Sequence, residues 1–193
     1  MSIERLLIVG AGGFGRAVAD AMPDGSVVAG FVDDRGRSCG PVMGLPVMGT
    51  TADLPTLRRA FDALVVAIGD NRRRRELCET ASTLGYRLAP IVHPRAWVSA
   101  HAHIGPGSIV MAGAIVGTEA VIGSGVIINA GAIVDHHAVV GDHAHLGVGS
   151  GLSGGARLGD GVWLHEGVFL ATGESVDPWR VIERAPTVGV LRS

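Results

Sequence analysis

The sequence is poor in aromatic residues and in cysteine. Aromatic side chains make up 4% of the 193 residues, and the two cysteines, Cys39 and Cys78, lie far apart. Their spacing fits neither a disulfide framework nor a cysteine-ligated zinc site, and a reducing cytoplasm is the expected compartment. No apolar run is long enough for a signal peptide or a membrane span, because the N-terminal run LLIVGAGG is short and rich in glycine. We therefore expect a soluble, cytoplasmic protein that does not bind membranes.

An excess of charge of either sign is also missing. The formal net charge is −2, with 18% charged and 47% hydrophobic residues. This balance gives no support to a nucleic-acid partner, and it provides enough apolar side chains for one packed domain or two small ones. The one basic run, Arg72–Arg75, is predicted to be the solvated face of a helix.

Glycine, in contrast, is abundant, with 30 residues, and the second half of the chain is periodic. From Val92 onward an aliphatic residue returns at every sixth position, and a small or β-branched residue follows most of them four positions later. No ordinary helix or strand has this period. The aliphatic positions are Val92, Val98, Ile104, Val110, Val116, Ile122, Ile128, Val134, Val140, Leu146, Leu152, Leu158, Leu164, Leu170 and Val176.

A hexapeptide period is typical of a parallel β-helix, in which short strands and tight corners surround a narrow aliphatic core. Three hexapeptides form one triangular coil, so residues eighteen apart should stack. The pattern loses its small residue at Glu174, and we expect the β-helix to span residues 91–176. Residues 177–193 are then a short C-terminal tail.

The first half, residues 1–90, is predicted to be an open α/β domain of about half the usual dinucleotide fold. The stretch RLLIVGAGGFG indicates a buried strand, a glycine loop with Gly10, Gly12 and Gly15 in the G-x-G-x-x-G pattern, and a following helix. A second strand ends at Asp33 and Asp34, where carboxylates would face a nucleotide. From this half alone, NAD binding is one interpretation, and a structural turn that needs small residues is another.

The stretches IVGAGGFGR, FVDD, VVAIGDNRRRR, IVHPRAWVS, IINAGAIVDHHAVVGDHAHL and SGGARLGDGVWL occur together and in order. In this combination the chain resembles the bacterial nucleotide-sugar N-acetyltransferases grouped with sialic acid O-acetyltransferase-like proteins. The resemblance covers residues 5–170. It implies a left-handed β-helix, a homotrimer, a nucleotide-sugar held by the N-terminal domain, and acetyl-CoA bound between adjacent β-helices.

The resemblance also assigns roles to individual residues. His136 matches the general base, with Asp135 and His137 beside it as further catalytic candidates. Asn129 matches a residue near the acceptor sugar. His145 matches a second active-site histidine and Gly154 a backbone N–H at the acetyl carbonyl, so both are acetyl-CoA-binding candidates. The nucleotide-sugar pocket is expected to comprise Gly10, Gly12, Gly13, Phe14, Asp33 and Asp34.

Three features depart from the family pattern. His137 stands where many relatives have an acidic residue directly after the base, so Asp135 would have to replace it. Phe14 stands where several relatives carry a histidine, which points to a different base or sugar. The coil and tail that usually follow the repeat are missing or reduced.

Imidazole, with an ordinary pKa of about 6.5, suits proton transfer at neutral pH. Together with this chemistry, the resemblance implies an acetyl-CoA-dependent N-acetyltransferase that acts on a nucleotide-linked amino sugar, without a metal. Sugar O-acetylation and a non-catalytic nucleotide-binding scaffold are the alternatives. A zinc site like that of γ-type carbonic anhydrases is a third: His101 and His137 have a suitable separation, but Asp142 stands where the third histidine would be.

Overall fold

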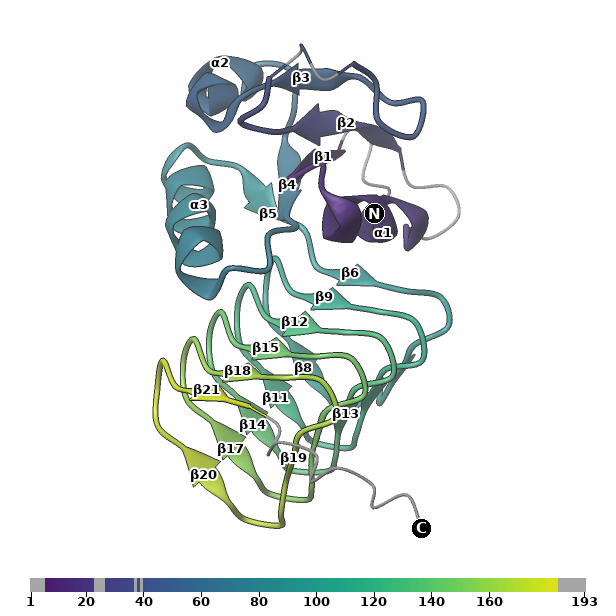
Figure 1. The fold of residues 1–193 in the computed structure, drawn as a ribbon, viewed down its shortest axis with the longest axis vertical. Helices are drawn as coiled ribbons and strands as arrows, with labels where there is room; N and C mark the ends of the chain where they lie inside the picture. Colours follow the sequence, from purple (N-terminus) through teal and green to yellow (C-terminus); the bar gives the residue numbers. More distant parts are fainter. Residues whose placement is uncertain (1–5, 23–26, 37, 39, 184–193) are drawn as a thin grey trace, which may run out of the picture.

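The computed structural model describes residues 6–22, 27–36, 38 and 40–183, and it contains two parts (Figure 1). An α/β domain lies at one end, and a triangular stack of short parallel strands extends away from it. Cys39 lies outside the described residues. None of the described helices combines the length and the apolar character needed to cross a lipid bilayer.

The N-terminal domain is a five-stranded parallel sheet in the order β3-β2-β1-β4-β5. Alternate residues of β1 point to its two faces: Leu6 and Ile8 join the cluster under α1, and Leu7 and Val9 the cluster under α2 and α3. The predicted open α/β domain is confirmed. Its strands are β1 Leu6–Val9, β2 Val28–Val32, β3 Val47–Gly49, β4 Ala63–Val66 and β5 Arg87–Leu88. Its helices are α1 Gly13–Asp20, a 3₁₀ turn Thr51–Asp53, α2 Leu54–Leu57 and α3 Asn71–Thr83.

The β-helix has three faces, and each of its strands is two residues long. The first face contains β6 Ile91–Val92, β9 Ile109–Val110, β12 Ile127–Ile128, β15 His145–Leu146, β18 Trp163–Leu164 and β21 Val181–Ile182. The second face contains β7 Trp97–Val98, β10 Ile115–Val116, β13 Ile133–Val134, β16 Gly151–Leu152 and β19 Phe169–Leu170. The third face contains β8 His103–Ile104, β11 Val121–Ile122, β14 Val139–Val140, β17 Arg157–Leu158 and β20 Ser175–Val176.

Stacking follows the predicted eighteen-residue spacing. Within the second face, for example, Val98 pairs with Val116, which pairs with Val134. The residue at each sixth position ends a strand and points inward, and together these residues form the aliphatic core of the β-helix. Because the preceding residue of each strand points outward, the faces display a separate set of side chains.

From Gly107 onward, each described corner between faces turns the chain through a residue with positive φ. Among the described residues, nine of these corner positions are glycine, with φ between 62° and 71°. Glycine adopts this conformation without steric cost. Four corners carry another residue there: Glu119, His137, His143 and Trp179.

The expected end of the β-helix at residue 176 is wrong. Strand β21 pairs with β18 in register, with Trp163 opposite Val181 and Leu164 opposite Ile182. Trp179, which lies in the expected tail, takes the left-handed corner position with φ 62°. The period-six signal at Ile182 is therefore structural. Residues 184–193 of the expected tail lie outside the described residues.

The interpretation of Arg72–Arg75 as a solvated face is wrong for one residue. Arg74 is completely buried between the two parts of the molecule. Its guanidinium donates to the carbonyls of Ile68 and Gly69 in the N-terminal domain, and to those of Gly125 and His143 in the β-helix. Arg74 therefore fixes the domain on the β-helix.

Candidate active site

A pocket of about 400 Å³ lies at the carboxyl ends of β1, β2 and β4. In an open parallel sheet, this edge is where ligands bind. The sequence-predicted residues Gly10, Gly12, Gly13, Phe14, Asp33 and Asp34 all line it. Val9, Gly15, Val32, Thr51, Ala67, Ile68 and Gly69 complete the lining.

The glycines of the loop have two different roles. Gly10 has φ 104°, and a methyl group on Gly15 would collide with the carbonyl oxygen of Gly10, so these two positions shape the turn. A methyl group on Gly12 or Gly13 would instead meet nothing within 4 Å. These two residues line the pocket at the start of α1, which has no side-chain cap, so an anionic ligand in the pocket can approach the N-terminus of that helix.

Asp33 supports the glycine loop. Its Oδ2 accepts the N–H of Ala11 at 2.8 Å, and its Oδ1 pairs with Nε of Arg35 at 2.7 Å. The hydrogen bonds from Arg35 and Ala11 hold the pKa of this carboxyl well below its ordinary value of 3.8, against the opposing effect of partial burial. Asp33 thus binds this loop to the chain segment after β2.

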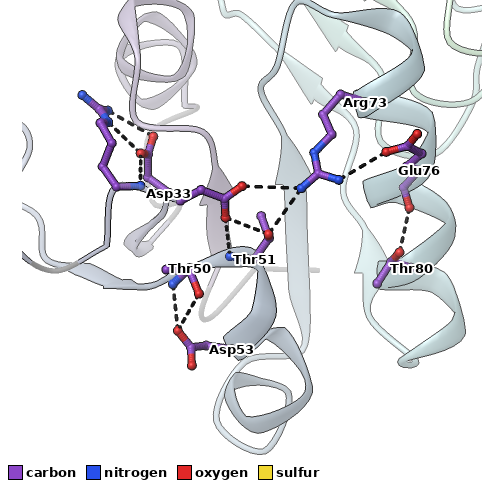
Figure 2. Close-up of polar contacts among 9 residues, drawn as sticks. Asp33, Thr50, Thr51, Asp53, Arg73, Glu76 and Thr80 are labelled. Carbon is purple, nitrogen blue, oxygen red and sulfur yellow. Dashed lines mark hydrogen bonds and ion pairs between the residues drawn. The ribbon is translucent and has the colours of Figure 1, made fainter.

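Asp34, the next residue after β2, has different partners from Asp33. Its Oδ1 accepts the N–H and the hydroxyl of Thr51 at 2.9 and 2.7 Å, and Arg73 on α3 approaches its Oδ2 at 3.4 Å (Figure 2). The two Thr51 bonds, followed by the charge of Arg73, lower the pKa of Asp34. Thr51 lines the pocket and Arg73 contacts it through Asp34, and the sequence patterns gave neither residue a role there.

His145 connects this pocket to the β-helix. It lies on β15 of the first face, is 8% exposed, and has Nδ1 3.4 Å from the carbonyl of Gly69, which lines the pocket. Its ring stacks on Trp163, one coil further, with centroids 5.3 Å apart. Burial, with a smaller effect from Arg74, lowers the pKa of His145 to about 4, so the ring is neutral at physiological pH. Among the described residues, nothing hydrogen-bonds its Nε2.

His136 lies at the corner between β13 and β14, on the edge between the second and third faces, as predicted. Its side chain is 60% exposed. The ring lies directly over Gly154, one coil further: a methyl group on Gly154 would stand 2.6 Å from Cε1 and 2.8 Å from Nε2. In the part of the chain that the structure describes, no acceptor takes the backbone N–H of Gly154.

The neighbours of His136 differ from the sequence-based expectation. Nδ1 of His136 lies 3.0 Å from Nδ1 of His137, and Nε2 of His137 lies 2.8 Å from a carboxylate oxygen of Glu119. Asp135 uses one oxygen to accept the backbone N–H of His136, and its other oxygen is 3.9 Å from the His136 Nε2. Glu119 was missed, although its position eighteen residues before His137 could have identified it.

The structure divides the predicted residues into two groups within one chain. Asn129 follows β12 and His145 belongs to β15, so both are on the first face or its edge, and His145 contacts the pocket-lining Gly69. Asp135, His136, His137 and Gly154 lie on the edge between the second and third faces. Asn129 accepts the N–H of Ala130 through its side-chain oxygen.

No cluster of three His, Cys, Asp or Glu side chains suited to a metal occurs among the described residues.

Comparison with known proteins gives a consistent result. A family model described as the PglD N-terminal domain matches residues 5–81. The structure of perosamine N-acetyltransferase from Caulobacter crescentus, solved as a histidine-to-asparagine variant with CoA and GDP-perosamine, is 34% identical. That match covers 94% of this chain and 87% of the other, with a TM-score of 0.89. The search of curated proteins gave no match.

Two further structures share the architecture. The acetyltransferase domain of PglB from Neisseria gonorrhoeae, in complex with acetyl coenzyme A, is 30% identical over 94% of this chain and 96% of its own, with a TM-score of 0.76. WeeI from Acinetobacter baumannii is 19% identical over 95% and 98%, with a TM-score of 0.72, which shows the fold alone. The prediction of an α/β domain followed by a left-handed parallel β-helix is confirmed.

Proposed function

This chain belongs to the hexapeptide-repeat nucleotide-sugar N-acetyltransferases, and we propose from this premise that it transfers the acetyl group of acetyl-CoA to the amino group of a nucleotide-linked amino sugar. One observation carries the proposal: the ring of His136 lies against Gly154, so a base and a backbone N–H donor meet at one corner of the β-helix. Both co-substrates are metabolites of the cytoplasm, and we assign the activity to that compartment.

The pocket of the N-terminal domain is the proposed nucleotide site. The open backbone at Gly12 and Gly13, at the N-terminus of α1, favours the diphosphate. Asp34 is 59% exposed and can still accept from a base or a ribose while it bonds Thr51. Phe14 offers an apolar side chain in the lining. A nucleoside diphosphate is favoured over NAD because the similar perosamine N-acetyltransferase was solved with GDP-perosamine. The sheet itself does not separate the two ligands, since its order β3-β2-β1-β4-β5 follows that of the dinucleotide fold.

In the proposed reaction the amine nitrogen attacks the thioester carbonyl of acetyl-CoA. Nε2 of His136 accepts the proton that the nitrogen loses, the new C–N bond forms, and the C–S bond breaks to release the CoA thiolate, which then takes up the proton. The Gly154 N–H is positioned to donate to the carbonyl oxygen as negative charge develops on it. His145, neutral because of its burial, contacts the carbonyl of the pocket-lining Gly69 through Nδ1 and so lies against the wall of the proposed nucleotide site.

A homotrimer would complete this site. The pocket and His145 lie beside the first face, whereas His136 is on the edge between the second and third faces, so one chain does not join them. The second face exposes apolar side chains along its length, with Trp97 and Phe169 each 56% exposed and Ile115 40% exposed. Covering such a stripe with a second copy is favourable, and a three-fold arrangement would bring the His136 edge of one chain toward the pocket of the next.

The test is thiol release from acetyl-CoA with a panel of UDP-, GDP- and dTDP-linked amino sugars. Each amino sugar is paired with the same nucleotide-sugar carrying a hydroxyl at that carbon. We expect saturable release with an amino sugar and none with its hydroxyl partner. Release with the hydroxyl partners alone would indicate O-acetylation. Calorimetry with UDP, GDP, dTDP and NAD separates the site types, since tight binding of NAD alone would refute the nucleoside-diphosphate site.

A further inference from the structure

Three side chains from two coils form a continuous hydrogen-bonded line at the His136 corner. Glu119, from the coil before, contacts Nε2 of His137 at 2.8 Å, and Nδ1 of His137 is 3.0 Å from Nδ1 of His136. Glu119 and His137 stack because they occupy the same corner position eighteen residues apart.

The chemistry of these groups determines where the protons lie. A carboxylate only accepts hydrogen bonds, so the contact with Glu119 requires a proton on Nε2 of His137. A neutral imidazole carries one proton, which leaves Nδ1 of His137 as an acceptor. The hydrogen bond between the two Nδ1 atoms then requires that Nδ1 of His136 carries the proton and donates it to Nδ1 of His137. Consequently the free lone pair of His136 is on Nε2, the atom that lies over Gly154.

The backbone supplies a second, independent observation. Glu119 and His137 adopt φ values of 58° and 59°, where nine other described corners have glycine. A residue with a Cβ is disfavoured in this left-handed conformation. Two non-glycine residues in succession along the same edge, and in contact with each other, suggest that their side chains have a use.

We infer that Glu119 and His137 are positioning residues that hold His136 in the Nδ1-protonated tautomer and stabilise the charge it gains. This inference rests on the proposed function. When Nε2 of His136 takes the proton of the amine, the positive ring donates through Nδ1 to His137, which donates through Nε2 to Glu119. Many relatives carry a carboxylate directly after the base. In this chain the carboxylate of Glu119, on the neighbouring coil, takes its place and acts through His137.

Asp135 does not provide this support. One of its oxygens is bound by the backbone N–H of His136, and the other is 3.9 Å from Nε2, beyond hydrogen-bond distance. It also faces the nitrogen that must stay unprotonated, whereas the positioning contact is at Nδ1. Removal of the Asp135 carboxylate therefore leaves the tautomer of His136 unchanged.

The tautomers can be measured without any substrate. Long-range ¹H–¹⁵N spectra of the full chain, assigned with His136→Ala and His137→Ala, report which ring nitrogen carries the proton. We expect Nδ1–H for His136 and Nε2–H for His137 in the wild type. In Glu119→Gln the amide can donate to Nε2 of His137, so both rings are expected to change tautomer or become mixed. A wild-type His136 with its proton on Nε2 would overturn the inference, even if the enzyme is active.

Kinetics test the consequence for catalysis. We expect Glu119→Gln to lower kcat roughly 10- to 100-fold with both KM values unchanged, because these residues act on the base rather than on substrate binding. Glu119→Asp, which keeps the carboxylate, should retain more activity. Glu166→Gln is the matched control, since Glu166 is also an exposed corner glutamate beside a histidine, 3.9 Å from His165.

The outcomes separate the two claims. If Glu119→Gln turns over at the wild-type rate, or loses activity only through KM, the inference is wrong. If the wild type acetylates no substrate, the proposed function fails, and the wild-type tautomers still decide whether the hydrogen-bonded line exists.

Discussion

Substitution of Gly154 by alanine tests the geometry of the site without removing any catalytic atom. The added methyl group would lie 2.6 Å from Cε1 and 2.8 Å from Nε2 of His136, well inside van der Waals contact. All three of the nearest atoms belong to that one side chain. The ring must therefore move by about an ångström, and it can do so because it is 60% exposed.

The two expected effects have different sizes. Gly154 does not have a positive φ, so alanine fits the backbone, and the smaller entropy of the unfolded chain should stabilise the fold by about 0.4–1 kcal/mol, or about 1–4 °C in Tm. A displacement of about 1 Å at a reacting group costs about 100-fold in rate. We expect kcat in Gly154→Ala to fall by about that factor while the protein stays folded.

Steady-state thiol release and a thermal melt measure both quantities. The control is Thr172→Ala, because Thr172 occupies the same corner position eighteen residues further, away from His136, and is exposed. It places an alanine at the equivalent corner and should leave kcat unchanged. Wild-type turnover in Gly154→Ala would refute the arrangement of His136 over Gly154 as the reacting geometry, and a large fall in Tm would show that the methyl group collides with more than the ring.

Other residues give further predictions. His136→Ala should keep its Tm and its nucleotide affinity by calorimetry but lose about two to four orders of magnitude in kcat, and wild-type turnover would exclude His136 as the base. Arg74→Ala should lower the free energy of unfolding, measured with denaturant, by about 3–5 kcal/mol, because several buried carbonyls lose their donor. Arg75→Ala, at an exposed residue, should lower it far less, and equal losses would contradict the role of Arg74. The pKa of His145 is about 4 in the folded chain and about 6.5 in the unfolded chain, so the unfolded chain binds more protons between these two pH values. The free energy of unfolding therefore falls, by up to about 3 kcal/mol, as the pH decreases from 6.5 to 4. In His145→Gln this part of the pH dependence should be missing, and equal slopes for wild type and variant between pH 6.5 and 4 would disprove the shift.

The period of six predicted most of the β-helix because it follows directly from its geometry. An inward residue is needed once per strand, and strands repeat every six residues, so positions such as Val116 and Val134 could be placed from sequence alone. The end of the β-helix was misjudged because the small residue of the pattern is lost at Glu174, although Ile182 still follows the period.

Side-chain partners were harder to predict. Arg74 is buried among exposed arginines of the same helix, and only the docking of the domain on the β-helix distinguishes it from Arg73 and Arg75. Glu119 lacks a local signal, since its contact with His137 depends on the eighteen-residue stacking of corners. Period and glycine spacing determine the backbone, but such pairs follow only when residues are compared coil by coil.

The most direct test of the account is the identity of the product formed from acetyl-CoA and a nucleotide-linked amino sugar, determined by mass spectrometry after mild alkaline treatment. The account predicts one acetyl group per released CoA, held as an amide that survives alkali, and no such product from His136→Ala, although that variant still binds the nucleotide. An alkali-labile ester would contradict N-acetylation. A nucleotide that binds tightly but is never acetylated would contradict the assignment of an enzyme.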